Sequence, residues 1–149
     1  MRISTKTSIA LHLLILLEVF KEQKLTSELL AMSIGSNPAV VRNILGRLKK
    51  AGIVDVQRGT GGARLVMDPE DISIWRVYQA VDTATLAELV GVHPNPSSKC
   101  PVGSKINKLL EKPYLTISEA VQEAMSNYTL KQLLDEYEYL SSKETEDEL

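Results

Sequence analysis

A glycine-rich turn that carries one arginine, residues 58–62, constrains the fold of this chain more than any other feature. It separates two short runs of mostly apolar residues, Ile53 to Val56 and Leu65 to Met67. Two such runs joined by a few residues that include glycine predict a β-hairpin. Aromatic residues make up only 5% of the 149, so the core must be aliphatic, which is typical of a helix-rich protein. The hairpin should therefore be a small addition to a mainly helical fold.

Three segments with helical patterns precede the hairpin. Residues 8–22 carry apolar side chains at helical spacing, and residues 26–32 predict a short second helix. The third helix is expected to start where Asn37 can cap and Pro38 is tolerated in the first turn. Gly52 should end it after two lysines, because cations favour a helix C-terminus.

The rest of the chain also favours helix. Residues 68–71 should restart a helix after the hairpin. From Pro101 onward apolar residues recur every three or four positions, which predicts one long helix with a continuous apolar seam. Pro113 should kink or interrupt it, because proline removes a donor and crowds the preceding turn. Thr129 can cap a last helix that ends at Leu140.

The net charge of −2 conceals a strong asymmetry. The first 64 residues hold ten Lys or Arg against four Asp or Glu, and the remaining 85 hold seven against fifteen. The first part thus carries +6 and the second −8. A basic first half indicates contact with a polyanion, although a chance imbalance of solvated charges is the simpler alternative.

Several classes of protein fit the sequence poorly. No apolar run reaches the roughly 20 residues that span a bilayer, so no membrane association is expected. The single cysteine rules out an internal disulfide framework and fits a reducing cytoplasm. No Ser–His–Asp arrangement and no phosphate-binding loop appears, so we do not expect an enzyme.

Three helices followed by a basic hairpin form the layout of a winged helix-turn-helix. In that layout the third helix enters the DNA major groove with its exposed face. Arg42 and Asn43 lie on this face and can contact guanine and adenine edges, respectively. Ala39 and Val40 can meet thymine methyl groups. These residues predict sequence-specific binding of double-stranded DNA.

Further residues on this helix are candidates for phosphate contacts. Ser36 and Asn37 lie at its N-terminus, where backbone N–H groups attract a phosphate. Arg47, Lys49 and Lys50 near its C-terminus can contact phosphates or simply make the helix end soluble, and the sequence leaves both alternatives open.

The hairpin tip adds a second candidate contact. Arg58, next to Gly59, Gly61 and Gly62, can approach the sugar-phosphate backbone closely or reach into a narrow minor groove. The simpler alternative is that Arg58 is solvated and the glycines only build the turn.

The stretch of residues 51–65, AGIVDVQRGTGGARL, resembles the wing signature of the Rrf2-type bacterial transcriptional regulators. The opening MRIS and the recognition-helix start NPAVVRNI at residues 37–44 are similar to that family too. The resemblance implies a homodimer on a roughly palindromic operator, with long helices of two subunits crossing at the interface. It also implies base contacts at Ala39, Arg42 and Asn43, and a minor-groove contact at Arg58.

The chain departs from the iron–sulfur members of that family, which carry three cysteines in the loop. Cys100 alone cannot hold a cluster that usually needs four ligands, so no cofactor and no metal is expected. His93 offers one alternative, in which two subunits bring two His and two Cys to zinc. A loop histidine without metal is the simpler interpretation.

Cys100 precedes Pro101 and would lie at the N-terminal end of the long helix if that helix begins there. The helix dipole would then lower the pKa of the thiol and favour redox sensing, by a disulfide across the dimer or by sulfenic acid. The simpler alternative is a small, inert packing residue. Trp75 is expected in the core between the fourth helix and the winged domain, with an effector pocket as its alternative role.

We therefore predict a mainly α fold, a winged helix-turn-helix with a small β-hairpin wing plus a long dimerisation helix. The expected parts are a DNA-binding domain (1–82), a loop or sensor segment (83–100), dimerisation and C-terminal helices (101–140) and a frayed acidic tail (141–149). The predicted function is sequence-specific DNA binding by a homodimeric repressor, with its effector left open. The alternative is a winged-helix module that docks a protein partner.

Overall fold

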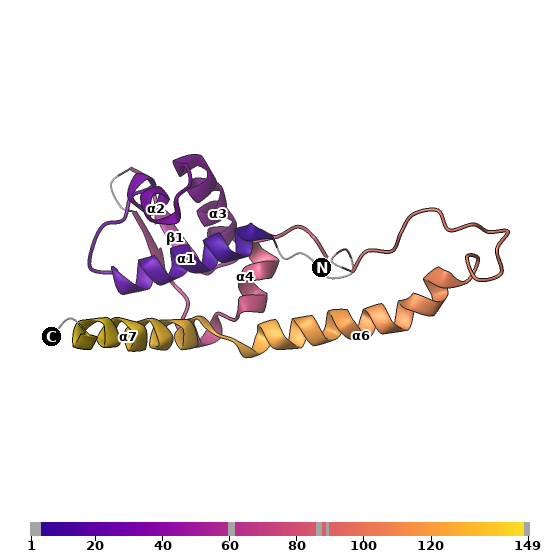
Figure 1. Ribbon diagram of the computed structural model, residues 1–149. Helices are drawn as coiled ribbons and strands as arrows, with labels where there is room; N and C mark the ends of the chain where they lie inside the picture. Colours follow the sequence, from indigo (N-terminus) through magenta and orange to yellow (C-terminus); the bar gives the residue numbers. More distant parts are fainter. Residues whose placement is uncertain (1–3, 60–61, 86–87, 89, 148–149) are drawn as a thin grey trace.

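The computed structural model describes residues 4–59, 62–85, 88 and 90–147, with side chains to residue 144. Figure 1 shows a mainly helical chain with one two-stranded antiparallel hairpin, as predicted. The elements in chain order are α1 (Thr5–Val19), α2 (Ser27–Ile34), α3 (Pro38–Lys50), β1 (Val54–Gln57), β2 (Gly62–Leu65), the 3-10 helix η1 (Pro69–Asp71), α4 (Ile74–Val81), α6 (Ile106–Asn127) and α7 (Leu130–Asp147).

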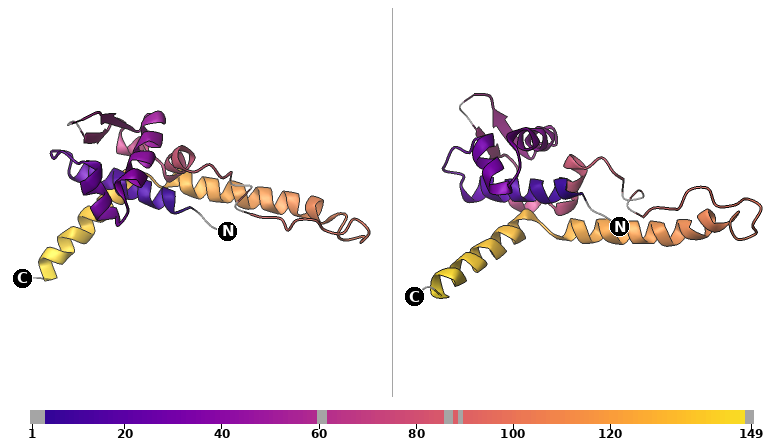
Figure 2. Two further views of the ribbon diagram at one scale, coloured as in Figure 1. Left: turned by 90° about the horizontal axis from the view of Figure 1, so that it is seen from above. Right: turned by 45° about the horizontal axis from the view of Figure 1, so that its top comes forward.

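The first five elements and α4 form one compact body around an aliphatic core. Leu13, Leu14 and Leu17 of α1 lie at its centre and are fully or almost fully buried. The apolar stripe of α3 joins them, and so do Leu130 and Leu134 of α7. The C-terminal helix thus returns to the N-terminal body and packs beneath α1, whereas α6 projects away from it (Figures 1 and 2).

The helix starts within this body follow local capping chemistry. Thr26 caps α2, and Asn37 caps α3 by accepting a hydrogen bond from the Val40 N–H at 3.0 Å. Pro38 occupies the first turn of α3, so this predicted start is confirmed. α2 runs to Ile34, two residues beyond the expected end, and stops at Gly35 in the left-handed conformation.

The hairpin has the predicted type but a different second strand. Val54 pairs with Leu65 and Gln57 with Gly62, so β2 ends at Leu65, where the sequence predicted it to begin. A short connection fixes this register, because the pairing must start directly after the turn. Val66 still extends the ladder by donating its N–H to the Ile53 carbonyl at 3.1 Å.

The expected helix restart after residue 68 is interrupted. η1 is a single 3-10 turn, and α4 begins only at Ile74, where Ser73 caps it. Ser73 forms a β-bridge with Thr129, and the Leu130 N–H donates to the Ile72 carbonyl at 2.8 Å. These bonds hold Ile72 and Ser73 extended and fasten the link between α6 and α7 to the body.

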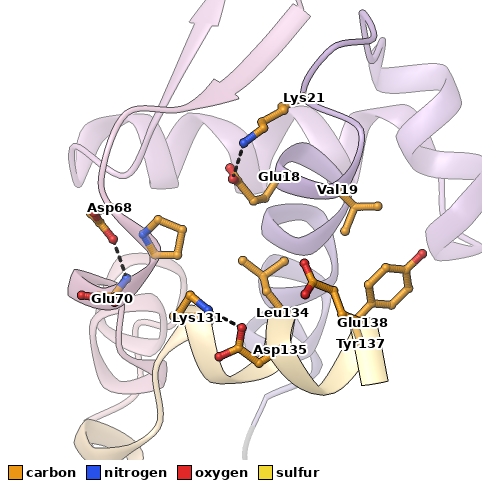
Figure 3. A pocket seen from close by; sticks show the side chains of 11 residues that line it. Glu18, Val19, Lys21, Asp68, Glu70, Lys131, Leu134, Asp135, Tyr137 and Glu138 are labelled. Atoms are coloured by element: carbon orange, nitrogen blue, oxygen red, sulfur yellow. Dashed lines mark hydrogen bonds and ion pairs between the residues drawn. The ribbon is translucent and has the colours of Figure 1, made fainter. Parts of the chain in front are cut away.

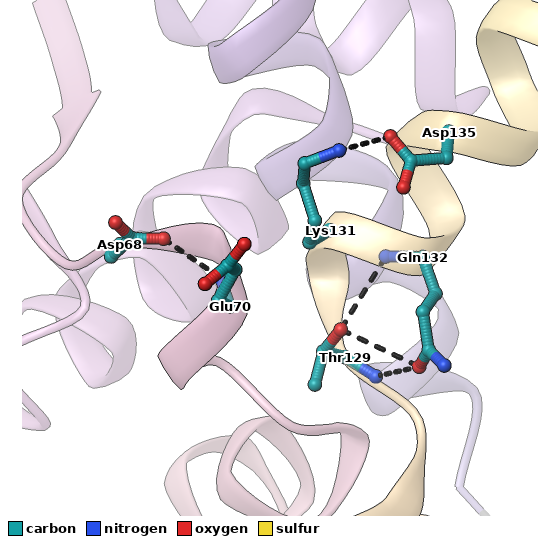
Figure 4. Close-up of polar contacts among 6 residues, drawn as sticks. All are labelled: Asp68, Glu70, Thr129, Lys131, Gln132 and Asp135. Carbon is teal, nitrogen blue, oxygen red and sulfur yellow. Dashed lines mark hydrogen bonds and ion pairs between the residues drawn. The ribbon is translucent and has the colours of Figure 1, made fainter.

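α6 begins later than expected, and α7 ends later than expected. α6 starts at Ile106 rather than at Pro101, and it continues through Pro113 without an interruption. Thr129 and Gln132 cap α7 reciprocally, since each side chain accepts a hydrogen bond from the other residue's N–H (Figure 4). α7 then runs to Asp147, so residues 141–147 are helical rather than frayed.

In the described part of the chain, the helices are too short or too polar to cross a lipid bilayer.

Candidate nucleic-acid interface

The exposed face of α3 carries the residues that were predicted to read bases. Val41, Ile44, Leu45 and Leu48 are buried, and Ala39, Arg42 and Asn43 lie exposed on the opposite side, with Val40 half-buried beside them. This division follows from helical periodicity, because residues three or four apart share a face. The structure therefore brings the predicted base-reading residues together on one accessible surface.

Arg42 has a partner that the sequence analysis missed. Its Nη1 atom lies 3.6 Å from the Glu28 Oε1 atom of α2, and both side chains are exposed. An exposed ion pair of this kind contributes little stability, so Arg42 remains free to exchange Glu28 for a base edge. The two residues are far apart in sequence, and only the packing of α2 on α3 brings them close.

Asn43 is held by Arg47, one turn further along α3. The Arg47 Nε–H donates to the Asn43 Oδ1 atom at 3.2 Å, and the Arg47 Nη1–H donates to the Val81 carbonyl at 3.3 Å. Arg47 is half-buried and is engaged within the protein rather than displayed toward solvent. The i,i+4 spacing of Asn43 and Arg47 could have indicated the first contact, but nothing local indicates Val81.

At the start of α3, the side-chain oxygen of Asn37 is occupied by its own cap. Ser36 is half-buried, and its N–H donates to the Ala31 carbonyl at 3.1 Å. The predicted phosphate contact at these two residues would therefore depend on the other first-turn N–H groups of α3. It stays a prediction.

The two lysines at the end of α3 differ in their surroundings. Lys49 donates to the Val56 carbonyl at 3.1 Å and lies 3.6 Å from Asp55 Oδ1, so it ties α3 to β1. Arg64 of β2 lies 3.9 Å from the same carboxylate. Lys50 is exposed and makes no hydrogen bond or ion pair with the described residues. Of the two, Lys50 is the one available to a phosphate.

The wing places Arg58 on the surface next to Gly59, which has a φ of +78°. Gly62 has a φ of +72°, and a Cβ atom there would lie 3.1 Å from the Leu25 carbonyl oxygen. Gly62 thus lets the wing approach the link between α1 and α2, which gives this glycine a packing role. Gly61 lies outside the described residues, so its predicted contact is untested.

Cys100 lies in a turn and not at a helix N-terminus. Its carbonyl accepts from the Ser104 N–H at 2.9 Å, and α6 begins only at Ile106. The thiol is exposed, and hydrogen bonds from the backbone N–H groups of Gly103 and Val102 lower its pKa. The expected direction of the shift is found, but the amides of a tight turn cause it, not the dipole of the long helix.

Trp75 packs differently from the expected core position. It is half-buried and stacks on Tyr78, with 5.5 Å between ring centroids, in a small cluster with Val121 and Met125 of α6. Burial, with the charges of Asp82 and Glu88, raises the pKa of the Tyr78 phenol. A cavity of about 390 Å³ adjoins the pair and is lined by Trp75, Tyr78, Gln79, Asp82, Ala84, Thr85 and Gln122. Because the stacked rings of α4 pack against Val121 and Met125, they connect α4 to α6.

A second cavity, of about 550 Å³, lies between α1, η1 and α7 (Figure 3). Its lining holds two ion pairs: Lys21 lies 3.1 Å from Glu18, and Lys131 pairs with Asp135, which raises the Lys131 pKa. Asp68, Glu70 and Glu138 also line the cavity, so it is acidic overall, and we assign no separate site to it.

The family model Rrf2, described as "Iron-dependent Transcriptional regulator", matches residues 3–136. The chain is 38% identical over 133 residues to YwnA of Bacillus subtilis (strain 168), whose name describes an HTH-type transcriptional regulator. This alignment covers 89% of the chain and 97% of that protein.

Solved structures agree with this match. A protein described as DNA-binding superposes with a TM-score of 0.67 at 33% identity, covering 87% of this chain and 98% of that one. A structure from Lactobacillus plantarum, described as a transcriptional regulator, gives a TM-score of 0.76 at 22% identity, covering 95% of this chain and 98% of that one. The latter supports the fold alone.

The family description names iron, but the residues of this chain do not fit an iron or iron–sulfur site. The sequence has one cysteine. Within the described residues, no three His, Cys, Asp or Glu side chains gather closely enough to hold a metal ion. A cluster usually needs four protein ligands, and the one cysteine of this chain does not supply them.

Proposed function

The chain belongs to the Rrf2 family of transcriptional regulators, and from this premise we propose that it is a homodimeric repressor of a roughly palindromic operator. The observation that carries the proposal is the exposed face of α3, with Ala39, Arg42 and Asn43 on one surface. A helix with this face in the major groove offers a guanidinium and an amide to purine edges and a methyl group to thymine.

The wing would make the second contact. Arg58 is exposed at its tip, and the glycines beside it allow close approach to the sugar-phosphate backbone. Lys50 adds attraction to phosphates at the end of α3. Base contacts then specify the sequence, and the two cations fix the position of the domain on the duplex.

A second copy of the chain is the proposed partner of α6. Leu109, Leu115 and Ile117 are 60%, 57% and 43% exposed, although they are large apolar side chains. α6 projects away from the body (Figure 1), and a cavity of about 580 Å³ opens on it, lined in part by Val92 and Leu115. Pairing with α6 of a second copy would cover this apolar surface. A dimer of this kind matches two half-sites related by a two-fold axis.

Operator selection from random DNA duplexes tests the proposal. We expect the purified protein to enrich a sequence with two inverted half-sites. Arg42→Ala should then weaken operator binding by about 1–3 kcal/mol and relax one position of each half-site. Lys50→Ala is the matched control, because loss of a phosphate contact should weaken binding to operator and scrambled DNA alike.

Two results would contradict the proposal. Equal losses on operator and scrambled DNA for Arg42→Ala would remove its base-reading role. If no sequence is enriched and binding depends little on salt, the phosphate contacts are missing, and a protein-docking module becomes the better interpretation.

A further inference from the structure

We propose that Arg47 is a positioning residue for base reading, which fixes the side-chain amide of Asn43 so that its NH₂ group faces the DNA. The inference rests on the proposed function, since it refines how the α3 face recognises a sequence. Arg47 itself would touch neither base nor phosphate.

The first step is the orientation of the amide. An asparagine side chain carries an acceptor oxygen and a donor NH₂ group, and a half-turn about its last bond exchanges them. In this structure the Oδ1 atom accepts from the Arg47 Nε–H at 3.2 Å. The reversed orientation would place the NH₂ group against a cationic donor, which is unfavourable. The guanidinium thus selects one of the two orientations.

The second step is the anchoring of Arg47. Its Nη1–H donates to the Val81 carbonyl at 3.3 Å, in a partly buried bond. Val81 is fully buried and is the last residue of α4. The carbonyls of a last helical turn lack partners within the helix and carry negative partial charge, so a guanidinium is favoured there. Held at both ends, Arg47 cannot reach a phosphate without giving up these bonds.

The third step is the consequence for recognition. With Oδ1 turned toward Arg47, the Nδ2 hydrogens of the exposed Asn43 are free to donate to a purine N7 atom. The second lone pair of Oδ1 can still accept from an adenine amino group, which completes the two-bond contact of asparagine with adenine. An asparagine that rotates freely would instead spend part of its time presenting the wrong group.

A comparison of four proteins tests the proposal: the wild type, Arg47→Lys, Asn43→Ala and the double variant. Each is titrated, by fluorescence anisotropy, against the selected operator and a scrambled duplex. Lysine keeps the charge but lacks the planar fork that bonds Asn43 and Val81 at once. We expect Arg47→Lys to lower the ratio of operator to scrambled affinity about tenfold, as Asn43→Ala does. The double variant should lose no more than Asn43→Ala.

Lys143→Arg is the matched control, since it exchanges one exposed basic side chain of α7, outside the proposed DNA contacts, and should leave the ratio as it is. Arg47→Lys with the wild-type ratio would overturn the proposal. Equal losses of affinity for the operator and the scrambled duplex would also overturn it, because they would indicate that Arg47 contacts a phosphate.

A second measurement changes the DNA rather than the protein. The operator adenine whose preference Asn43→Ala relaxes is replaced by 7-deazaadenine, which lacks the N7 acceptor. We expect about a tenfold loss of affinity for the wild type and none for Arg47→Lys. Unchanged wild-type affinity would overturn the proposal.

Failure of this inference can be told apart from failure of the proposed function. If the wild type selects no operator, the proposed function fails. If Arg42→Ala behaves as expected but Arg47→Lys does not, this inference alone fails.

Discussion

The Cys100 thiol is exposed in a turn whose backbone amides, those of Gly103 and Val102, lower its pKa. A lowered pKa keeps the thiolate present as the pH falls below the ordinary pKa of cysteine, about 8.5. The native protein should therefore react with iodoacetamide faster than the urea-unfolded chain at pH 7. The two rates should converge well above pH 9, where both forms are thiolates. Because the chain has one cysteine, the mass of the alkylated protein reports on this residue alone.

Equal rates at pH 7 would show that the turn does not activate the thiol. Thiol sensing itself is tested by a separate measurement, the response of operator binding to mild peroxide. Cys100→Ser is the matched control. If peroxide still changes operator binding by this variant, Cys100 is not the sensor. Reversal by reductant would distinguish a disulfide or sulfenic acid from further oxidation.

At the scale of single residues, the sequence predicts the exposed face of α3 but not the partners of its side chains. Ala39, Arg42 and Asn43 could be assigned because the buried stripe of the helix defines the opposite side. Glu28 and Val81 could not be assigned as partners, because tertiary packing of α2 and α4 brings them to α3. Arg47 shows the difference most clearly: its sequence position left a phosphate contact and a solubilising role open, whereas its two hydrogen bonds lie within the protein.

At the scale of elements, the start of α7 depends on one reciprocal cap. The Thr129 N–H donates to Gln132 Oε1 at 2.8 Å, and the Gln132 N–H donates to Thr129 Oγ1 at 3.4 Å (Figure 4). Thr129→Ala should lower the free energy of unfolding by about 1 kcal/mol, because it leaves the backbone N–H of Gln132 without its side-chain acceptor. Leu130 follows directly and is fully buried, so loosening of this turn reaches the core.

Urea unfolding at one fixed protein concentration measures this effect, since the stability of the proposed dimer would rise with protein concentration. Thr83→Ala is the matched control: Thr83 is exposed in the link after α4, and its change should stay within about 0.5 kcal/mol. Equal destabilisation by both variants would mean that the cap contributes nothing of its own.

The capped starts of α2, α3 and α7 were predictable and the starts of α4 and α6 were not, for a physical reason. A cap such as Asn37 with Pro38 acts over three or four residues, so the sequence contains all of it. The break between η1 and α4 depends instead on the bridge from Ser73 to Thr129, which pairs residues far apart in the chain. The register of β2 likewise depends on pairing with β1, and the local pattern placed that strand too late.

At the scale of the whole molecule, α3 is linked mechanically to α6, the helix that carries the exposed apolar surface. Arg47 bonds the end of α4, and Tyr78 of α4 packs against Met125 of α6. The Trp75–Tyr78 stack and its cavity lie at this joint. In the proposed dimer, a change in the angle between α4 and α6 would move the exposed α3 face of one subunit relative to that of the other, and so would change the spacing of the half-sites that the dimer fits.

Leu115 allows this whole-molecule arrangement to be tested. It is 57% exposed in the single chain, so Leu115→Glu should leave the fold of the subunit intact. If α6 pairs with α6 of a second copy, the new carboxylate would be buried there without a partner, which costs several kcal/mol. Sedimentation should then show the wild type at twice the chain mass of 16.5 kDa and the variant at the chain mass. Operator affinity should fall to that of a single half-site.

Leu140→Glu provides the matched control, because Leu140 is 53% exposed on α7 and outside the proposed interface. This variant should remain a dimer with wild-type operator affinity. A Leu115→Glu protein that stays dimeric would contradict pairing through α6. Dissociation by Leu140→Glu instead would place the interface on α7. In that case the apolar surface of α6 would need a different partner, and the angle between α4 and α6 would no longer set the spacing of the half-sites.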